Sequence, residues 1–124
     1  MSRPRHDDRG SASVWVLACC VLLLVVAGVV TIRMLAVLAR HRAESAADLA
    51  ALAAAGRIGV GADECLAARK VALADGARVS VCRLSLDADG RSGSVQVRVQ
   101  ADVHLPVVGT RTIDASARAG RLPG

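Results

Sequence analysis

The stretch SASVWVLACCVLLLVVAGVVTI, residues 11–32, carries no charged side chain, although a charged head precedes it and Arg33 follows it. As an α-helix it would be roughly 33 Å long, which is enough to cross the hydrocarbon core of a bilayer. A chain of 124 residues could hardly bury such a segment on every side. The stretch therefore predicts a membrane-inserted helix, with Trp15 near one end, where an indole suits the headgroup region.

A cleaved secretory signal is the alternative interpretation, since Arg3, Arg5 and Arg9 could form its basic head. The apolar core of such a signal is normally about 7 to 15 residues long and ends at small residues. The run at residues 11–32 continues well past that length. Retention in the membrane is therefore favoured over release.

The formal net charge of +5 could suggest nucleic acid as a partner. Trp15 is the only aromatic residue, however, and it lies in the apolar run. The arginines are dispersed among Asp and Glu, so neither a stacking platform nor a dense basic patch remains. We expect no nucleic-acid partner.

The helical pattern continues beyond Arg33 through an alanine-rich stretch that ends at Ala55. Alanine is the strongest helix former, and Arg40 and Glu44 have the spacing of an attractive pair on one helix face. Gly56 and the glycines after it would end the helix, because glycine readily adopts the left-handed conformation found there. One helix over residues 11–55, part membrane and part aqueous, would be roughly 67 Å long.

Two segments flank the apolar run at a spacing more specific than either segment alone: DRGSASV at residues 8–14 and RHRAESAADLAALAAA at residues 40–55. This arrangement resembles the N-terminal domain of TadE- and TadG-like proteins, which are pseudopilin-like components of bacterial tight-adherence (Flp) pilus systems. The similarity covers roughly residues 1–55. The charges alone leave the topology open, because arginines lie on both sides of the span.

The resemblance implies a single-pass protein of the cell membrane, with a cytoplasmic leader at residues 1–10 and an extracytoplasmic C-terminal domain. It also implies that a prepilin peptidase cuts between Gly10 and Ser11, and that an inner-membrane platform and a cytoplasmic assembly ATPase are partners. Pilin-like chains often carry glutamate at the fifth position after the cut, where this chain has Trp15. A second interpretation makes Gly10 a helix-breaking residue just outside the bilayer.

Small residues in the span could let another helix approach closely, as at many interfaces between membrane helices. The candidates for such packing are Ala18, Ala27 and Gly28, together with Trp15. They could equally be ordinary filler of the span.

Residues 56–124 predict a small α+β domain. A short helix is expected at residues 63–75 and strands at 78–86, 94–105 and 110–117, which form a three-stranded antiparallel sheet. In the first strand the apolar parity changes between Val81 and Cys82, which indicates a bulge.

The cysteines divide into two pairs. Cys19 and Cys20 are expected as apolar span residues, whereas Cys65 and Cys82 fall in the part expected outside the cytoplasm, where disulfides persist. We favour a Cys65–Cys82 disulfide over two free thiols. A metal site is not expected, because neither cysteine lies in a paired ligand motif and the histidines are scattered.

We expect neither catalytic residues nor a cofactor, because no grouping of Ser, His and Asp, no P-loop and no dinucleotide-binding turn is present. His104 is expected as a solvated strand residue. Asp87 and Asp89 fit a turn better than a calcium loop, whose other ligands are missing.

The function that follows is a non-enzymatic, membrane-anchored assembly component similar to a minor pseudopilin of a pilus or secretion system. It would contact the lipid bilayer and other pilin-like subunits. The alternatives are a permanently anchored scaffold that never polymerises, which Trp15 favours, and a secreted binding module released by signal peptidase.

Overall fold

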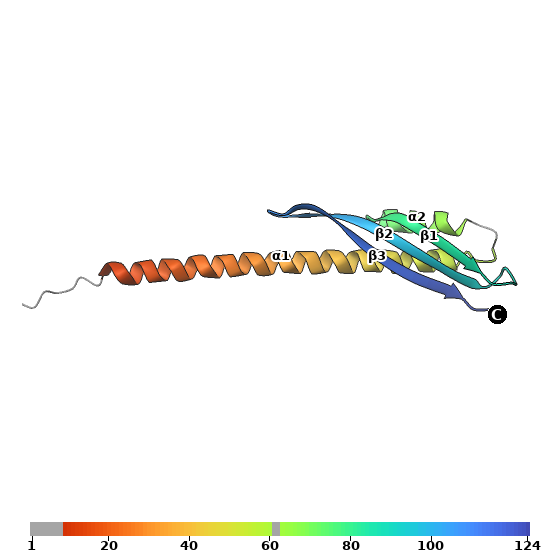
Figure 1. Cartoon of the computed structure of the whole chain (residues 1–124), viewed down its shortest axis with the longest axis horizontal. Coiled ribbons are helices and arrows are strands. Elements are labelled where there is room, and N and C mark those ends of the chain that lie inside the picture. The colour runs from red at the N-terminus through yellow and green to blue at the C-terminus, as the bar shows by residue number, and fades with distance from the viewer. Residues whose placement is uncertain (1–8, 61–62) are drawn as a thin grey trace, which may run out of the picture. The chain divides into compact units, whose positions relative to one another are not determined.

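The computed structural model describes residues 9–60 and 63–124 (Figure 1). It divides into two compact units, Met1–Met34 and Leu35–Gly124. The first helix, α1, is Arg9–Ala55, so residues of both units contribute to it. Gly10 lies in the first turn of α1 and does not break the helix, which makes the helix-breaking interpretation of this residue wrong. Most of the predicted leader lies outside the described residues.

The described part of the first unit is helix with its apolar side chains exposed. Trp15 is 71% exposed and Leu24 is 73% exposed, and none of the most hydrophobic window of α1 is buried. By length and composition the helix could cross a membrane. This agrees with the expectation from residues 11–32.

The second unit contains a three-stranded antiparallel sheet in the order β1-β2-β3. The strands are β1 (Arg78–Leu86), β2 (Gly93–Leu105) and β3 (Gly109–Arg121). With α1 and α2 (Glu64–Ala74) they confirm the α+β class. The prediction for β3 ended too early, at residue 117. Pairing with β2 carries this strand on to Arg121, through Ala119 and Gly120, whose own preference for strand is weak.

The bulge predicted in β1 is present, but it lies earlier than the parity change indicated. Val79 pairs with Val99 and Val81 with Arg98, so the register shifts between Val79 and Val81. Val81 therefore shares the polar face of the sheet with Arg98, and Cys82 returns to the apolar face opposite Val97. The bulge therefore places apolar residues of β1 on both faces of the sheet.

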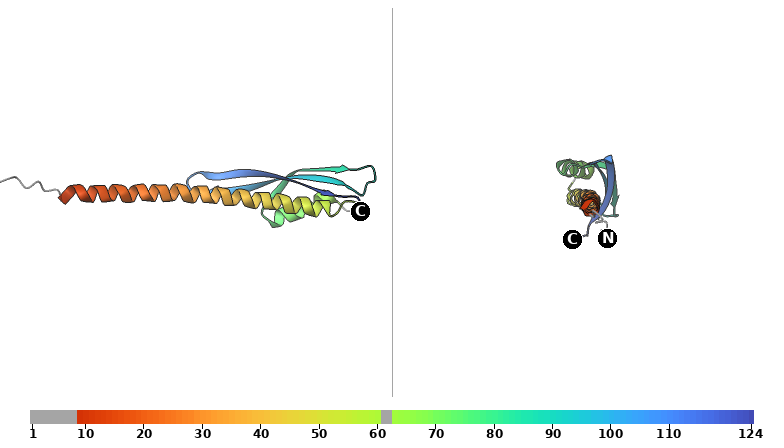
Figure 2. Two further views of the ribbon diagram at one scale, coloured as in Figure 1. Left: turned by 90° about the horizontal axis from the view of Figure 1, so that it is seen from below. Right: turned by 90° about the vertical axis from the view of Figure 1, so that its left-hand side faces the viewer.

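The core of the second unit lies between the apolar face of the sheet and the two helices. Figure 2 shows α2 and the C-terminal part of α1 on the same side of the sheet. Val95, Val97 and Val99 of β2 are fully buried against them. The residues of α1 that are buried in this core are all alanines, and each has another three or four positions away in the sequence: Ala43, Ala46, Ala47, Ala50, Ala51, Ala54 and Ala55.

The sequence predicts the limits of α2 to within one residue at each end, since the expected helix is 63–75 and residues 63 and 75 are its caps. The Asp63 side chain caps its N-terminus by accepting a hydrogen bond from the Leu66 N–H at 3.0 Å. At the other end Gly76 has φ +75, and the Ala77 N–H donates to the Ala72 carbonyl at 2.8 Å. This pattern closes the last turn with glycine in the left-handed conformation.

Candidate functional site

The predicted processing site lies at the start of α1. Gly10 and Ser11 are both exposed, and a Cβ added at Gly10 would meet no atom within 4 Å. The first N–H groups of a helix have no intrahelical partner, so this turn opens more readily than a turn in the helix interior. The site is sterically accessible within the described residues.

One face of the span carries a shallow, open groove between exposed side chains. The side chains that line the groove are Val14, Leu17, Ala18, Val21, Leu22 and Val25. At 100° per residue, Gly28 follows Val25 on nearly the same face, Trp15 flanks the groove and Ala27 lies on the opposite face. Of the predicted packing residues, Ala18 and Gly28 therefore share a side that Ala27 does not.

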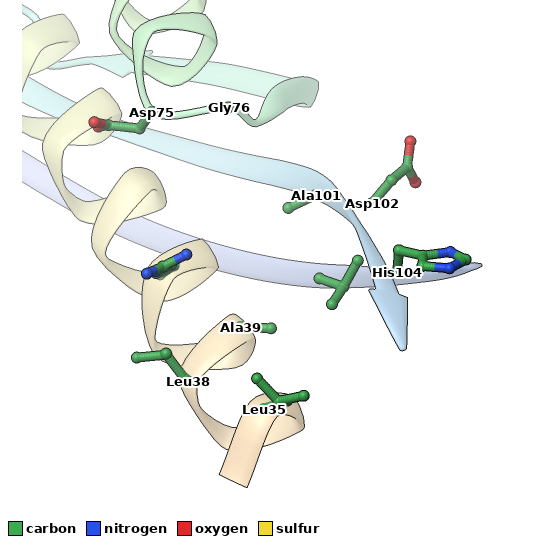
Figure 3. Close-up of a pocket in the computed structure, with 10 residues that line it drawn as sticks. Leu35, Leu38, Ala39, Asp75, Gly76, Ala101, Asp102 and His104 are labelled. Atoms are coloured by element: carbon green, nitrogen blue, oxygen red, sulfur yellow. The ribbon is translucent and has the colours of Figure 1, made fainter. Parts of the chain in front are cut away.

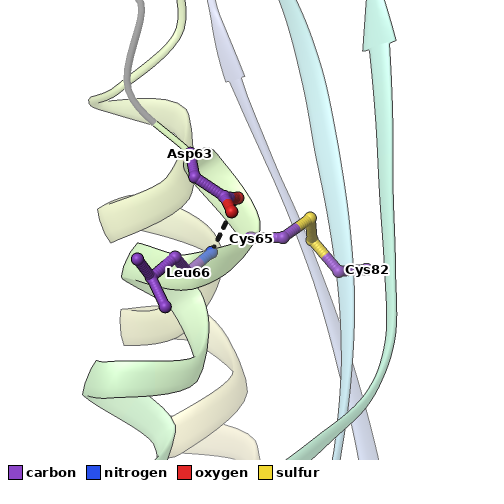
Figure 4. The surroundings of a disulfide bond; sticks show 4 residues. All are labelled: Asp63, Cys65, Leu66 and Cys82. Carbon is purple, nitrogen blue, oxygen red and sulfur yellow. Dashed lines mark hydrogen bonds between the residues drawn. A yellow bond between two sulfur atoms is a disulfide. The ribbon is translucent and has the colours of Figure 1, made fainter.

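The predicted disulfide is present. Cys65 of α2 and Cys82 of β1 are bonded with their Cα atoms 5.9 Å apart (Figure 4). The bond joins the short helix to the edge strand of the sheet beside the Asp63 cap. Cys19 and Cys20 are free and exposed.

The side chain of Asp89 closes the turn between β1 and β2. The carboxylate of Asp89 accepts hydrogen bonds from the Arg91 and Ser92 N–H groups at 3.0 Å and from the Ser92 hydroxyl at 2.8 Å. The Ser92 hydroxyl bond, with help from the two N–H groups, lowers the pKa of Asp89 below its usual 3.8. Among residues 9–60 and 63–124, no three His, Cys, Asp or Glu side chains cluster as metal ligands.

A cavity of about 320 Å³ lies between α1 and β2, near the loop after α2. Figure 3 shows the side chains of Asp102 and His104 on the side of β2 away from Leu35 and Ala39. Asp102 instead accepts hydrogen bonds from Arg78 and from the Thr112 hydroxyl, both at 2.8 Å. The side chains of Asp102 and His104 are therefore directed to the outer face of the sheet, although both residues belong to the lining of the cavity. His104 is exposed, as predicted.

Two features of the second unit are not among those predicted from the sequence. The sequence predicts the alanines of α1 only as helix formers, although their spacing of three and four residues marks a buried stripe. The tip of the β2–β3 hairpin is the second such feature. Val107 at this tip is fully exposed, with φ +71, and Val108 beside it is 46% exposed. The unbroken run of apolar residues in this turn is the signal in the sequence that could have revealed the exposed tip.

Comparison with known families bears on the first part of the chain. Residues 10–57 match the family model described as "Putative Flp pilus-assembly TadE/G-like". The match confirms the resemblance noted from the two flanking segments and supports involvement in Flp pilus assembly. No curated protein and no solved structure matches the chain. The matched residues end just after α1, so α2 and the sheet lie outside the match.

Proposed function

With residues 10–57 matched to the TadE/G-like pilus-assembly family, we propose that the chain is a membrane-anchored, pseudopilin-like minor component of a Flp/Tad-type pilus or secretion assembly. The family match is the observation that carries this proposal. It includes the apolar part of α1, with its exposed side chains, and the alanine stripe that packs under the sheet. The matched helix thus combines a membrane anchor with the support of a folded domain.

In this proposal the leader is cytoplasmic and the second unit is extracytoplasmic. The Cys65–Cys82 disulfide supports that placement, because disulfides persist in oxidising compartments and are rare in the cytosol. A domain with a core made largely of alanine and valine also gains from a covalent staple.

The proposed mechanism is structural and not catalytic. The grooved face of the span, with Ala18 in it and Gly28 beyond it, packs against the span of another assembly subunit. The second unit then presents a contact surface outside the membrane. A prepilin peptidase, an inner-membrane platform and an assembly ATPase are the partners that this role requires.

A permanently anchored scaffold is the second candidate, and Trp15 is the observation that favours it. Trp15 is 71% exposed beside the grooved face, at the position where pilin-like chains often carry glutamate. An indole near the end of a span suits the headgroup region and holds the helix at a fixed depth. A subunit that enters a fibre has to leave that environment.

Intact mass and N-terminal sequencing of the membrane-fraction protein from its native host test the proposal, with cysteines alkylated without reduction. A chain beginning at Ser11 is expected for a pseudopilin. A chain that keeps Met1 or Ser2 would contradict processing and favour the scaffold. A start beyond Ile32, with protein in the medium, would establish the secreted module.

A Gly10→Leu variant supplies the matched control for processing. Because an added Cβ at position 10 meets no atom within 4 Å, the substitution leaves the fold undisturbed. If a peptidase recognises the glycine, the variant accumulates at full length in the membrane. An unchanged N-terminus at Ser11 in the variant would show that Gly10 is not read by the enzyme.

A further inference from the structure

The tip of the β2–β3 hairpin is an exposed apolar surface in the second unit. β2 ends at Leu105, which pairs with Gly109, and Pro106, Val107 and Val108 form the turn. The Val107 side chain makes no protective contact, since its exposed fraction is 101%. Loop tips of soluble domains are normally polar, so this tip calls for a specific surface to cover it.

The backbone at the tip holds the apolar side chain outward at an energetic cost. Val107 has φ +71, and it is the only non-glycine residue with positive φ in the described part of the chain. A β-branched side chain is disfavoured in this conformation, which glycine or asparagine normally takes in such a turn. Strain of this kind points to a role for the valine that folding alone does not supply.

The position of the hairpin within its unit indicates what lies opposite the tip. Val103 and His104 line the same cavity as Leu35, the first residue of this unit and the one joined to the span through Met34 (Figure 3). The chain continues from His104 for only one residue before the turn begins. The tip is therefore at the end of the second unit where its helix continues into the apolar run.

The surroundings of the tip have the chemistry of a membrane interface. Leu35 and Leu38 in the cavity lining are 39% and 48% exposed. Between Val103 and Arg111 the chain has no acidic residue, and exposed Arg111 lies opposite Val103 in the register. Apolar side chains with nearby cations suit the boundary between acyl chains and anionic headgroups.

We infer that the hairpin tip, residues 105–109, inserts its valines into the headgroup region of the bilayer and gives the second unit a second membrane contact. This inference rests on the proposed function, because it requires the apolar part of α1 to span that bilayer. The tip stays at the interface and does not enter the hydrocarbon core, since a turn leaves backbone polar groups unpaired.

A fluorophore that reports its environment tests the insertion in the full chain. In a Cys19→Ala, Cys20→Ala background, Val107→Cys gives one labelling site, because Cys65 and Cys82 remain bonded. The matched control is Leu122→Cys, which is 86% exposed and follows Arg121 at the opposite end of the β2–β3 ladder. Both labelled proteins are reconstituted into vesicles of phosphatidylethanolamine and phosphatidylglycerol that contain a headgroup-level nitroxide lipid.

Several-fold stronger quenching and a blue-shifted emission are expected at position 107 relative to position 122. Trp15, the only aromatic residue, reports on the span in the same samples. Quenched Trp15 with an aqueous label at position 107 would overturn the tip insertion and leave the anchor intact. An unquenched, solvent-exposed Trp15 would overturn the proposed anchor and the inference with it.

Two further variants test whether the substitution at position 107 itself disturbs the turn. A label at Val108→Cys repeats the measurement at a residue whose φ is not positive, and it should also be quenched. Val107→Asn keeps a residue that tolerates the left-handed conformation but removes the apolar group. With that substitution the label at position 108 should lose most of its quenching while the unfolding temperature does not fall. Undiminished quenching would contradict the role of Val107.

Discussion

The two parts of α1 treat apolar side chains in opposite ways. Up to Met34 the helix exposes large ones, such as Leu24 and Trp15. From Leu35 on it buries only alanines, and its leucines, including Leu49 and Leu52, remain exposed. One helix thus carries a stripe of small residues where the sheet packs on it. It carries bulky apolar residues where no other element of the described chain packs on it. Residue size as well as hydrophobicity therefore separates the two parts of the helix.

The largest expected effect comes from Gly93→Ala in the second unit. A Cβ at this position would lie 2.3 Å from the Ser85 carbonyl oxygen, and φ is +151. Overpacking and backbone strain together should lower the free energy of unfolding by about 4 kcal/mol. Thermal unfolding of the full chain in detergent, followed by far-UV circular dichroism, measures the loss. Gly90→Ala, with φ +64 and no atom within 4 Å, should cost only about 1 kcal/mol.

One substitution made in both parts of α1 tests the comparison directly. Ala50→Leu forces a larger side chain into a site of 0% exposure, which should destabilise the second unit by about 3 kcal/mol. Ala18→Leu, on the exposed apolar part, should leave that unfolding transition unchanged. Equal effects of the two substitutions would show that the alanine stripe is not a packing surface.

Removal of the disulfide should destabilise the second unit to a similar or slightly smaller extent. Cys65 and Cys82 are 17 residues apart, and releasing a loop of that length costs about 3 kcal/mol in the chain-entropy model. A Cys65→Ser, Cys82→Ser variant should unfold at a lower temperature than the oxidised protein, whereas Cys19→Ser should not. An unchanged midpoint for the double variant would show that the bond adds no stability.

The smallest expected effect is a dependence of the stability of the second unit on acidic pH. The pKa of Asp89 is lowered in the folded state, so its hydrogen bonds contribute stability that is present above the usual value of 3.8 and is lost as pH falls through the folded pKa. Asp89→Asn should therefore narrow the difference in unfolding temperature between pH 5 and pH 2. The span should keep its helical signal throughout. A variant that loses stability in acid as the parent does would contradict the role of this carboxylate.

Local patterns in the sequence predicted most secondary structure, whereas long-range pairing decided the remainder. The Asp63 cap and the Gly76 stop depend on neighbouring residues, so the limits of α2 could be read from them. The last residues of β3 could not be predicted, because Ala119 and Gly120 are held in the strand by pairing with β2 and not by their own preference. Gly10 and Ser11 could be selected from the sequence, and the predicted helix begins at Ser11, but the place of Gly10 inside the first turn of α1 could not be predicted.

The sequence by itself determined the apolar helix, the α+β class and the cysteine pair, because each depends on composition, periodicity or compartment. Only the tertiary structure decided which alanines form the core, where the bulge in β1 lies and which end of the second unit carries the apolar hairpin tip. These features depend on contacts between residues far apart in the chain. A local pattern specifies which surface an element has, but the partner that covers that surface is chosen only when the chain folds.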